Sequence, residues 1–366
     1  MSLWDALKNI REKKAEQLVY VAIPSERVIG GAEPVPVEAR KTYIRLWLAE
    51  MSLDTERKWY AEFAPVVHSA IELQFGTTSK PVTIPHVAGP VQLPDLGKQV
   101  GKGVSVNHAL TPLLPFNGGS ISIAAALVAN KTADHLDTML GVLGDLSKVI
   151  TAPQLSSVLG IAGPLANGAE RLLGLQDGRV MLTLNDTFVD AGGNADNLIT
   201  GGYRAVVQAP VSALKAETLW VEEGSLRVGT SRDNLKPLVG YDYMLLRTET
   251  RTERTDWSQL TNLSTARDEA LACLESGKLD EGDTRIKAAV FAALRCPELT
   301  RADAMRVARS MRAEYDELRS LMADGAIPGE RGDFGALIAS GPSVDEVANE
   351  YDLDRDPTRY LAALTR

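Results

Sequence analysis

Histidine and cysteine are the residue types in this chain that most readily bind metals or attack substrates, and their spacing matches no known site. The four histidines are His68, His86, His108 and His135. They show neither the HExxH pattern nor the paired helical spacing of zinc ligands. Cys273 and Cys296 are not in a CxxC arrangement, and no serine lies in a Gly-x-Ser-x-Gly sequence. We therefore predict no catalytic residue, no metal site and no cofactor, although a catalytic site assembled from distant residues remains an alternative.

Two loops have the composition of ligand-binding loops but lack the required spacing. Residues 97–103 contain glycines and two lysines, yet a phosphate-binding loop needs four residues between its glycines and a Ser or Thr after the lysine. Residues 190–197 offer Asp and Asn oxygens on a tight turn, but they match no EF-hand loop. We interpret the first as a flexible glycine loop and the second as a hairpin loop between strands.

The end of the chain, residues 343–366, has the pattern of two short helices. Ser343 can cap the first helix, and the second begins near Pro357. The outline is similar to a helix-turn-helix, but its many acidic residues would repel DNA phosphates. We predict instead that this module docks on another protein. The residues predicted to make that contact are Val344, Val347, Tyr351, Leu353, Arg355, Arg359 and Tyr360.

A central segment, residues 149–169, contains no charged side chain. We interpret it as part of a helical hairpin at residues 132–174 that packs over a sheet or against a partner. The alternative is that this segment leaves the fold after a trigger such as proteolysis and then inserts into a membrane or forms an oligomer interface. The apolar residues that would then act are Leu155, Val158, Leu159, Ile161 and Leu165.

Composition indicates an ordinary globular protein. Of the 366 residues, 45% are hydrophobic and 24% charged, and the net charge is −9. This acidic balance argues against a nucleic-acid partner, which would require clustered Lys and Arg. The N-terminal residues lack an apolar core of signal-peptide length, and the sparse cysteines fit a reducing compartment. We expect a cytoplasmic protein, with a bacterial source favoured.

The pattern of the remaining chain predicts an α+β fold. Residues 1–16 suit an amphipathic helix, and residues 17–257 a β-rich, antiparallel sandwich-like domain with the hairpin inserted. The predicted strands cover residues 17–23, 41–49, 66–75, 82–84, 120–129, 180–189, 203–208, 218–221, 226–228 and 241–252. Residues 258–324 predict a helical bundle, with helices at 260–275, 280–294 and 301–322, and Thr300 as the N-cap of the last. A linker at residues 325–342 follows.

These observations favour a non-catalytic interaction or regulatory component of a larger assembly. The expected partner is another protein, with a homo-oligomer as a further possibility and no nucleic acid. The alternatives from other classes are a membrane-acting or self-assembling effector and an enzyme of a type that the motifs do not reveal.

Overall fold

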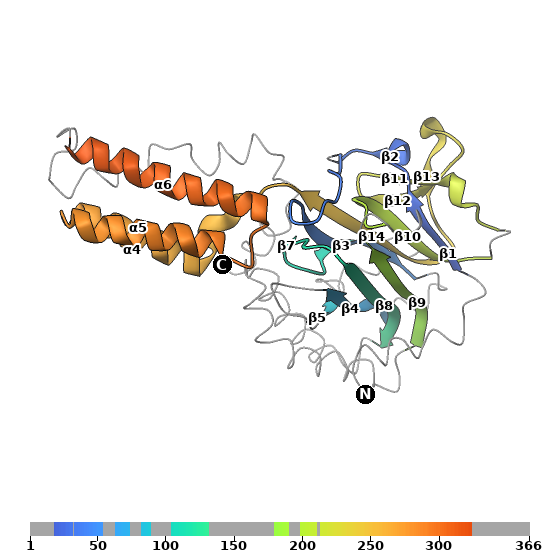
Figure 1. Cartoon of the computed structure of the whole chain (residues 1–366). Helices are drawn as coiled ribbons and strands as arrows, with labels where there is room; N and C mark the ends of the chain where they lie inside the picture. Colours follow the sequence, from blue (N-terminus) through green and yellow to red (C-terminus); the bar gives the residue numbers. More distant parts are fainter. Residues whose placement is uncertain are drawn as a thin grey trace. The chain divides into compact units, whose positions relative to one another are not determined.

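The computed structural model describes residues 18–31, 33–53, 63–73, 82–88, 104–131, 179–189, 198–210 and 213–323 (Figure 1). The chain forms two compact units. The sheet unit comprises Met1–Leu260 and Cys296–Ala304, and the helical unit comprises Thr261–Arg295 and Met305–Arg366. The described strands form three mostly antiparallel sheets, and the three α-helices follow them in the chain. The predicted α+β class is thus confirmed.

The largest sheet of the sheet unit has an antiparallel core of five strands. Their order is β1 (Leu18–Ile23), β10 (Gly202–Gln208), β14 (Asp242–Arg251), β3 (Tyr43–Ser52) and β6 (Val104–Ala109). A short strand, β7 (Leu114–Pro115), also pairs with β3. The register between β3 and β14 shifts by a bulge between Leu245 and Leu246, so one residue of β3 is inserted there.

The second sheet contains the long strands of the chain. It runs β5 (Val82–Ala88), β4 (Phe63–Leu73), β8 (Ser120–Lys131) and β9 (Arg179–Val189), all antiparallel. Every side chain of β8 from Ile123 to Ala129 is buried. The continuous apolar run at this place therefore forms a strand covered on both faces, as its length predicts.

The third sheet is small and lies over the first. It consists of β13 (Lys236–Pro237), β12 (Ser225–Val228), β11 (Leu219–Glu222) and β2 (Val28–Ile29), with β2 parallel to β11. The sequence predicts strands at residues 218–221 and 226–228, but it does not predict that they form a separate layer.

The side chains of β14 point alternately to the two faces of the first sheet, and this shows how the three sheets pack together. Met244 and Leu246 join the hydrophobic cluster shared with β4 and β8, whereas Tyr243 and Leu245 join a second cluster with Leu219 of the small sheet. Successive strand residues point to opposite faces. The first sheet is therefore the middle layer of the sheet unit and carries a core on each face.

The helical unit contains α4 (Thr261–Glu275), α5 (Leu279–Leu294) and most of α6 (Arg301–Ala323). All three begin and end within about one residue of the predicted ranges, inside the usual uncertainty of helix ends. Gly277, with a φ of 72°, ends the turn after α4, where a left-handed conformation favours glycine. Among the described helices, none combines the length and apolar content needed to cross a membrane.

Several predicted elements lie outside the described residues: the N-terminal helix, the hairpin at 132–174, the loop at 190–197, the linker and the terminal helical pair. The sequence in turn does not predict β2, β6, β7 and β13. Three of these strands have only two residues each, so partner strands rather than a local pattern determine them.

Candidate functional site

The Tyr315 hydroxyl of α6 reaches the backbone of α5 at a position where α5 has a glycine. A Cβ added to Gly282 would lie 2.6 Å from the Tyr315 hydroxyl oxygen. That hydroxyl donates to Asp283 Oδ1 at 3.0 Å, and Arg319 pairs with the same carboxylate. The hydrogen bond from Arg319 holds the pKa of Asp283 below its ordinary value, while burial raises the pKa of Tyr315 to about 12.

These contacts define the register of the two helices. Asp283 lies near the start of α5, and its partners Tyr315 and Arg319 lie in the second half of α6. Two helices that meet in this way run antiparallel, so the end of α5 lies level with the region of Met305. The side chains that close their shared core are Ile286, Ala289, Ala293, Val307, Met311 and Tyr315, all fully buried.

Apolar side chains remain exposed once this core is complete. Phe291 is 59% exposed, Leu294 40% and Met305 45%. Arg295 and Arg309, both exposed, lie one helical turn after Phe291 and Met305 and therefore on the same faces. We call these five residues the α5–α6 patch. Phe291 lies on the side of α5 opposite the buried Ile286, Ala289 and Ala293. Exposed large apolar side chains are candidates for contact with another protein.

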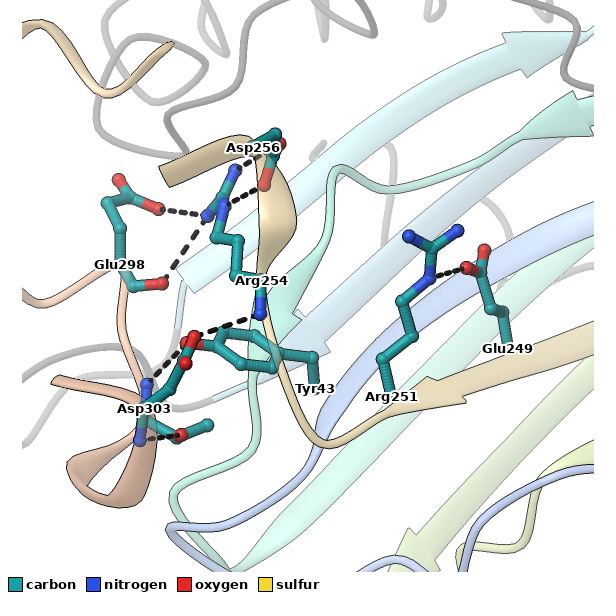
Figure 2. A network of polar contacts seen from close by, with 8 residues as sticks. Tyr43, Glu249, Arg251, Arg254, Asp256, Glu298 and Asp303 are labelled. Carbon is teal, nitrogen blue, oxygen red and sulfur yellow. Dashed lines mark hydrogen bonds and ion pairs between the residues drawn. The ribbon is translucent and has the colours of Figure 1, made fainter. Parts of the chain in front are cut away.

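A buried polar cluster inside the sheet unit is the second candidate (Figure 2). Tyr43, on β3, donates its hydroxyl to Asp303 Oδ2 at 2.8 Å and accepts from the Thr300 amide at 2.9 Å. The Arg254 amide donates to the same Asp303 oxygen at 2.9 Å. The Asp303 amide donates to Thr300 Oγ1 at 3.2 Å, which confirms Thr300 as the N-cap of α6.

The Arg254 guanidinium extends this cluster. Its Nε donates to Asp256 Oδ1 at 2.8 Å, and Nη1 donates to the Glu298 carbonyl at 3.3 Å and lies 3.8 Å from Glu298 Oε2 (Figure 2). Arg254 and Asp303 are 1% and 2% exposed and Tyr43 is fully buried. Burial raises the pKa of Tyr43 well above its ordinary value, so the phenol stays neutral. Because solvent cannot reach these groups, the cluster serves to hold residues 296–304 against the end of β3.

A third group of polar residues lies on the face of the first sheet. The Trp47 ring is contacted by the guanidinium groups of Arg247, 4.7 Å from its centroid, and Arg45, at 5.5 Å. Trp47 Nε1 donates to Glu249 Oε2 at 2.7 Å, and Arg251 pairs with the other Glu249 oxygen (Figure 2). Burial alone would raise the pKa of Glu249, but the neighbouring arginines and hydrogen bonds lower it below its ordinary value. Arg247 Nε is buried and has no hydrogen-bond partner among the described residues, so this group is not fully satisfied internally.

Three of the four histidines lie among the described residues: His68 and His86 are buried, and His108 is half-buried. His68 is fully buried, and neither of its ring nitrogens has a hydrogen-bond partner among the described residues. The rings of His86 and His108 meet edge-on, with centroids 5.1 Å apart. Burial lowers the pKa values of His68 and His108 to about 4, so both are neutral near pH 7. Sequence spacing does not predict the meeting of His86 and His108, which depends on how β5 and β6 are brought together.

Within the described ranges, no three His, Cys, Asp or Glu side chains are arranged to hold a metal ion. Neither cysteine forms a disulfide, and both are buried. The residues predicted for docking in the terminal module and those of the uncharged central segment all lie outside the described residues. Sequence reasoning did not identify the α5–α6 patch, although Phe291 and Leu294 fall off the apolar face of Ile286, Ala289 and Ala293.

Comparison with protein-family models, with curated proteins and with solved structures finds no significant match to this chain.

Proposed function

We propose that this chain is a non-catalytic interaction component that acts in the cytoplasm and docks on another protein through its C-terminal module, residues 343–366. The observation that carries the proposal is the exposure of Phe291, Leu294 and Met305 in the helical unit. A helical unit that leaves apolar side chains uncovered after completing its core is typical of a protein that binds other helices.

Two further observations support the compartment and the class of partner. Neither Cys273 nor Cys296 forms a disulfide, as expected in a reducing cytosol. The net charge of −9 favours a protein partner over nucleic acid, since phosphate binding needs an excess of basic residues. Nothing in the described residues favours a membrane-acting effector or an enzyme over this function.

The proposal is tested by photo-crosslinking in the natural host. A photoreactive phenylalanine analogue replaces Tyr351, on the predicted apolar face of the first terminal helix, in the full-length chain at its native expression level. The matched control places the same analogue at Asn349, on the opposite face of that helix.

We expect irradiation to join the Tyr351 position to one other protein, with little product from Asn349. The absence of any product with a second protein at Tyr351, across growth conditions, would overturn the proposed function.

A further inference from the structure

We propose that Arg247, on the face of the first sheet, is the anchor of a carboxylate-binding site for an acidic segment of a partner protein. The site consists of Arg45, Trp47, Arg247, Glu249 and Arg251, and we call it the Trp47 site. All five residues belong to the sheet unit. The site uses no residue of the proposed docking module, so the inference goes beyond the proposed function and does not rest on it.

Strand pairing brings the members of the site together on one face of the sheet. Arg247 of β14 lies opposite Trp47 of β3, and Glu249 lies opposite Arg45. Residues two apart on a strand point to the same face, so Arg247 and Glu249 share the face of Leu245. The small sheet packs on that face. The Trp47 site therefore continues this face from the core that the small sheet covers.

The Trp47 ring holds two guanidinium groups in place. Trp47 is only 4% exposed, and the guanidinium carbons of Arg247 and Arg45 lie over its ring at 4.7 Å and 5.5 Å from the centroid. Arg247 is half-buried. The N–H donors of a guanidinium group lie in its plane, so an arginine that stacks on an aromatic ring can still donate from its edge.

The arginines of the site differ in their ionic partners. Arg45 lies 4.0 Å from one oxygen of Glu249, and Arg251 pairs with the other oxygen. The Arg247 guanidinium forms neither an ion pair nor a hydrogen bond with any described residue, and its Nε is buried from solvent. A buried N–H group without a partner is costly. Arg247 is therefore a positioned positive group whose donors are unused.

The geometry and charge of Arg247 favour a carboxylate. A guanidinium edge binds a carboxylate through two parallel N–H···O bonds. Three arginines face one glutamate, so the site is locally positive in a chain whose net charge is −9. Because Glu249 already pairs with Arg45 and Arg251, one singly charged group balances Arg247, whereas a phosphate close to −2 would also be repelled by Glu249.

The position of the site on a sheet face favours a peptide over a small acid. Arg251 is 47% exposed at its margin, and the half-buried Tyr203 of β10 lies opposite Arg247 on the neighbouring strand. A small acid would contact little beyond the Arg247 edge. A peptide that places a carboxylate on Arg247 also contacts Tyr203 and the aliphatic part of the arginine side chains, which adds buried apolar area.

Isothermal titration calorimetry on the purified full-length chain at low ionic strength tests this inference. The probes are a tetraglutamate peptide with blocked ends, the matched tetraglutamine peptide and inorganic phosphate. The wild type is compared with Arg247→Gln, with Arg247→Lys, which keeps the charge but loses the planar edge, and with the control Arg232→Gln. Arg232 is exposed and forms no ion pair within the described part of the chain.

The control removes the same charge at a distant place. Arg232 follows β12, at the opposite end of the β11–β12 pair from the turn at Gly224. A Cβ added to Gly224 would lie 4.0 Å from the Tyr203 hydroxyl oxygen, so that turn is the end of the hairpin nearer to the site. Thermal unfolding checks that each variant is folded, and Arg247→Lys carries the test if Arg247→Gln is not.

We expect the tetraglutamate peptide to bind the wild type and Arg232→Gln with affinities within about twofold of each other. Binding should weaken about tenfold or more in Arg247→Gln and about threefold or more in Arg247→Lys, and the tetraglutamine peptide should not bind. No measurable binding of tetraglutamate, or equal weakening in Arg232→Gln and Arg247→Gln, would overturn the inference. Full affinity in Arg247→Lys, or phosphate binding as tight as that of the peptide, would also overturn it.

Discussion

In the sheet unit, His68 is buried and His108 is half-buried, and burial lowers the pKa of each imidazole to about 4 in the folded state. In an unfolded chain the pKa of histidine is about 6.5. The unfolded state therefore binds protons at a higher pH than the folded state. Their contribution to stability is complete above about pH 6.5 and is lost as the pH falls towards 4.

The difference between the folded and unfolded pKa values predicts that acid destabilises the protein through these two histidines. Full loss of the contribution of either histidine corresponds to about 3 kcal/mol of unfolding free energy. We expect urea unfolding to show a large decrease in stability between pH 7 and pH 4.5, and a clearly smaller decrease in His68→Leu. Parallel pH dependence in the two proteins would show that His68 does not titrate on unfolding.

Tyr43 offers a second test at the level of single residues. Its hydroxyl donates to Asp303 and accepts from the Thr300 amide, and all three groups are buried. We expect Tyr43→Phe to lower the unfolding free energy by about 1–3 kcal/mol, because two buried polar groups lose a partner.

The matched control is Tyr20→Phe. The Tyr20 hydroxyl donates to Asp186 at 2.6 Å, but the residue is 39% exposed, so water can replace the lost bond. We expect a loss below about 1 kcal/mol in chemical denaturation. Equal losses in the two variants would mean that the buried cluster adds nothing beyond an ordinary surface hydrogen bond.

At the scale of elements, the junction of α5 and α6 depends on Gly282. Alanine is the better helix former by up to about 1 kcal/mol, so this position would gain stability if space allowed. The added Cβ would instead lie 2.6 Å from the Tyr315 hydroxyl, which is held in place by Asp283. The glycine is therefore explained by the Tyr315 hydroxyl, which occupies the place that a Cβ would take.

We expect Gly282→Ala to destabilise the protein by about 1–2 kcal/mol, and to become neutral or stabilising when combined with Tyr315→Phe. A double-mutant cycle from thermal or chemical unfolding measures the coupling. Additive effects of the two substitutions would contradict the close contact at this junction.

Elements with a strong local pattern are predictable from this sequence. The apolar run at residues 120–129 and the spacing of Val307, Met311 and Tyr315 specify β8 and α6 almost to their ends. The cap of α6 is equally local. Its connection to Tyr43 joins residues 257 positions apart and depends on the tertiary fold, which no periodicity reveals. The same holds for the α5–α6 patch, whose members are recognised only when the face that each helix buries is known.

At the scale of the whole molecule, the chain combines a three-layer sheet unit with a helical unit that contains α4, α5 and most of α6. The sheet unit buries its long strands and most of its polar clusters. The helical unit exposes apolar and basic side chains at one end of α5 and α6. We therefore propose that the helical unit makes the contact with another protein and that the sheet unit supports it.

The most direct test of this account is the mass and composition of the assembly isolated from the natural host through a tag on the full-length chain. The wild type and the double variant Val347→Asp with Tyr351→Asp are compared by native mass spectrometry. The account predicts one partner in a fixed ratio with the wild type and loss of that partner in the terminal-helix variant. Isolation of both proteins without a partner would contradict it.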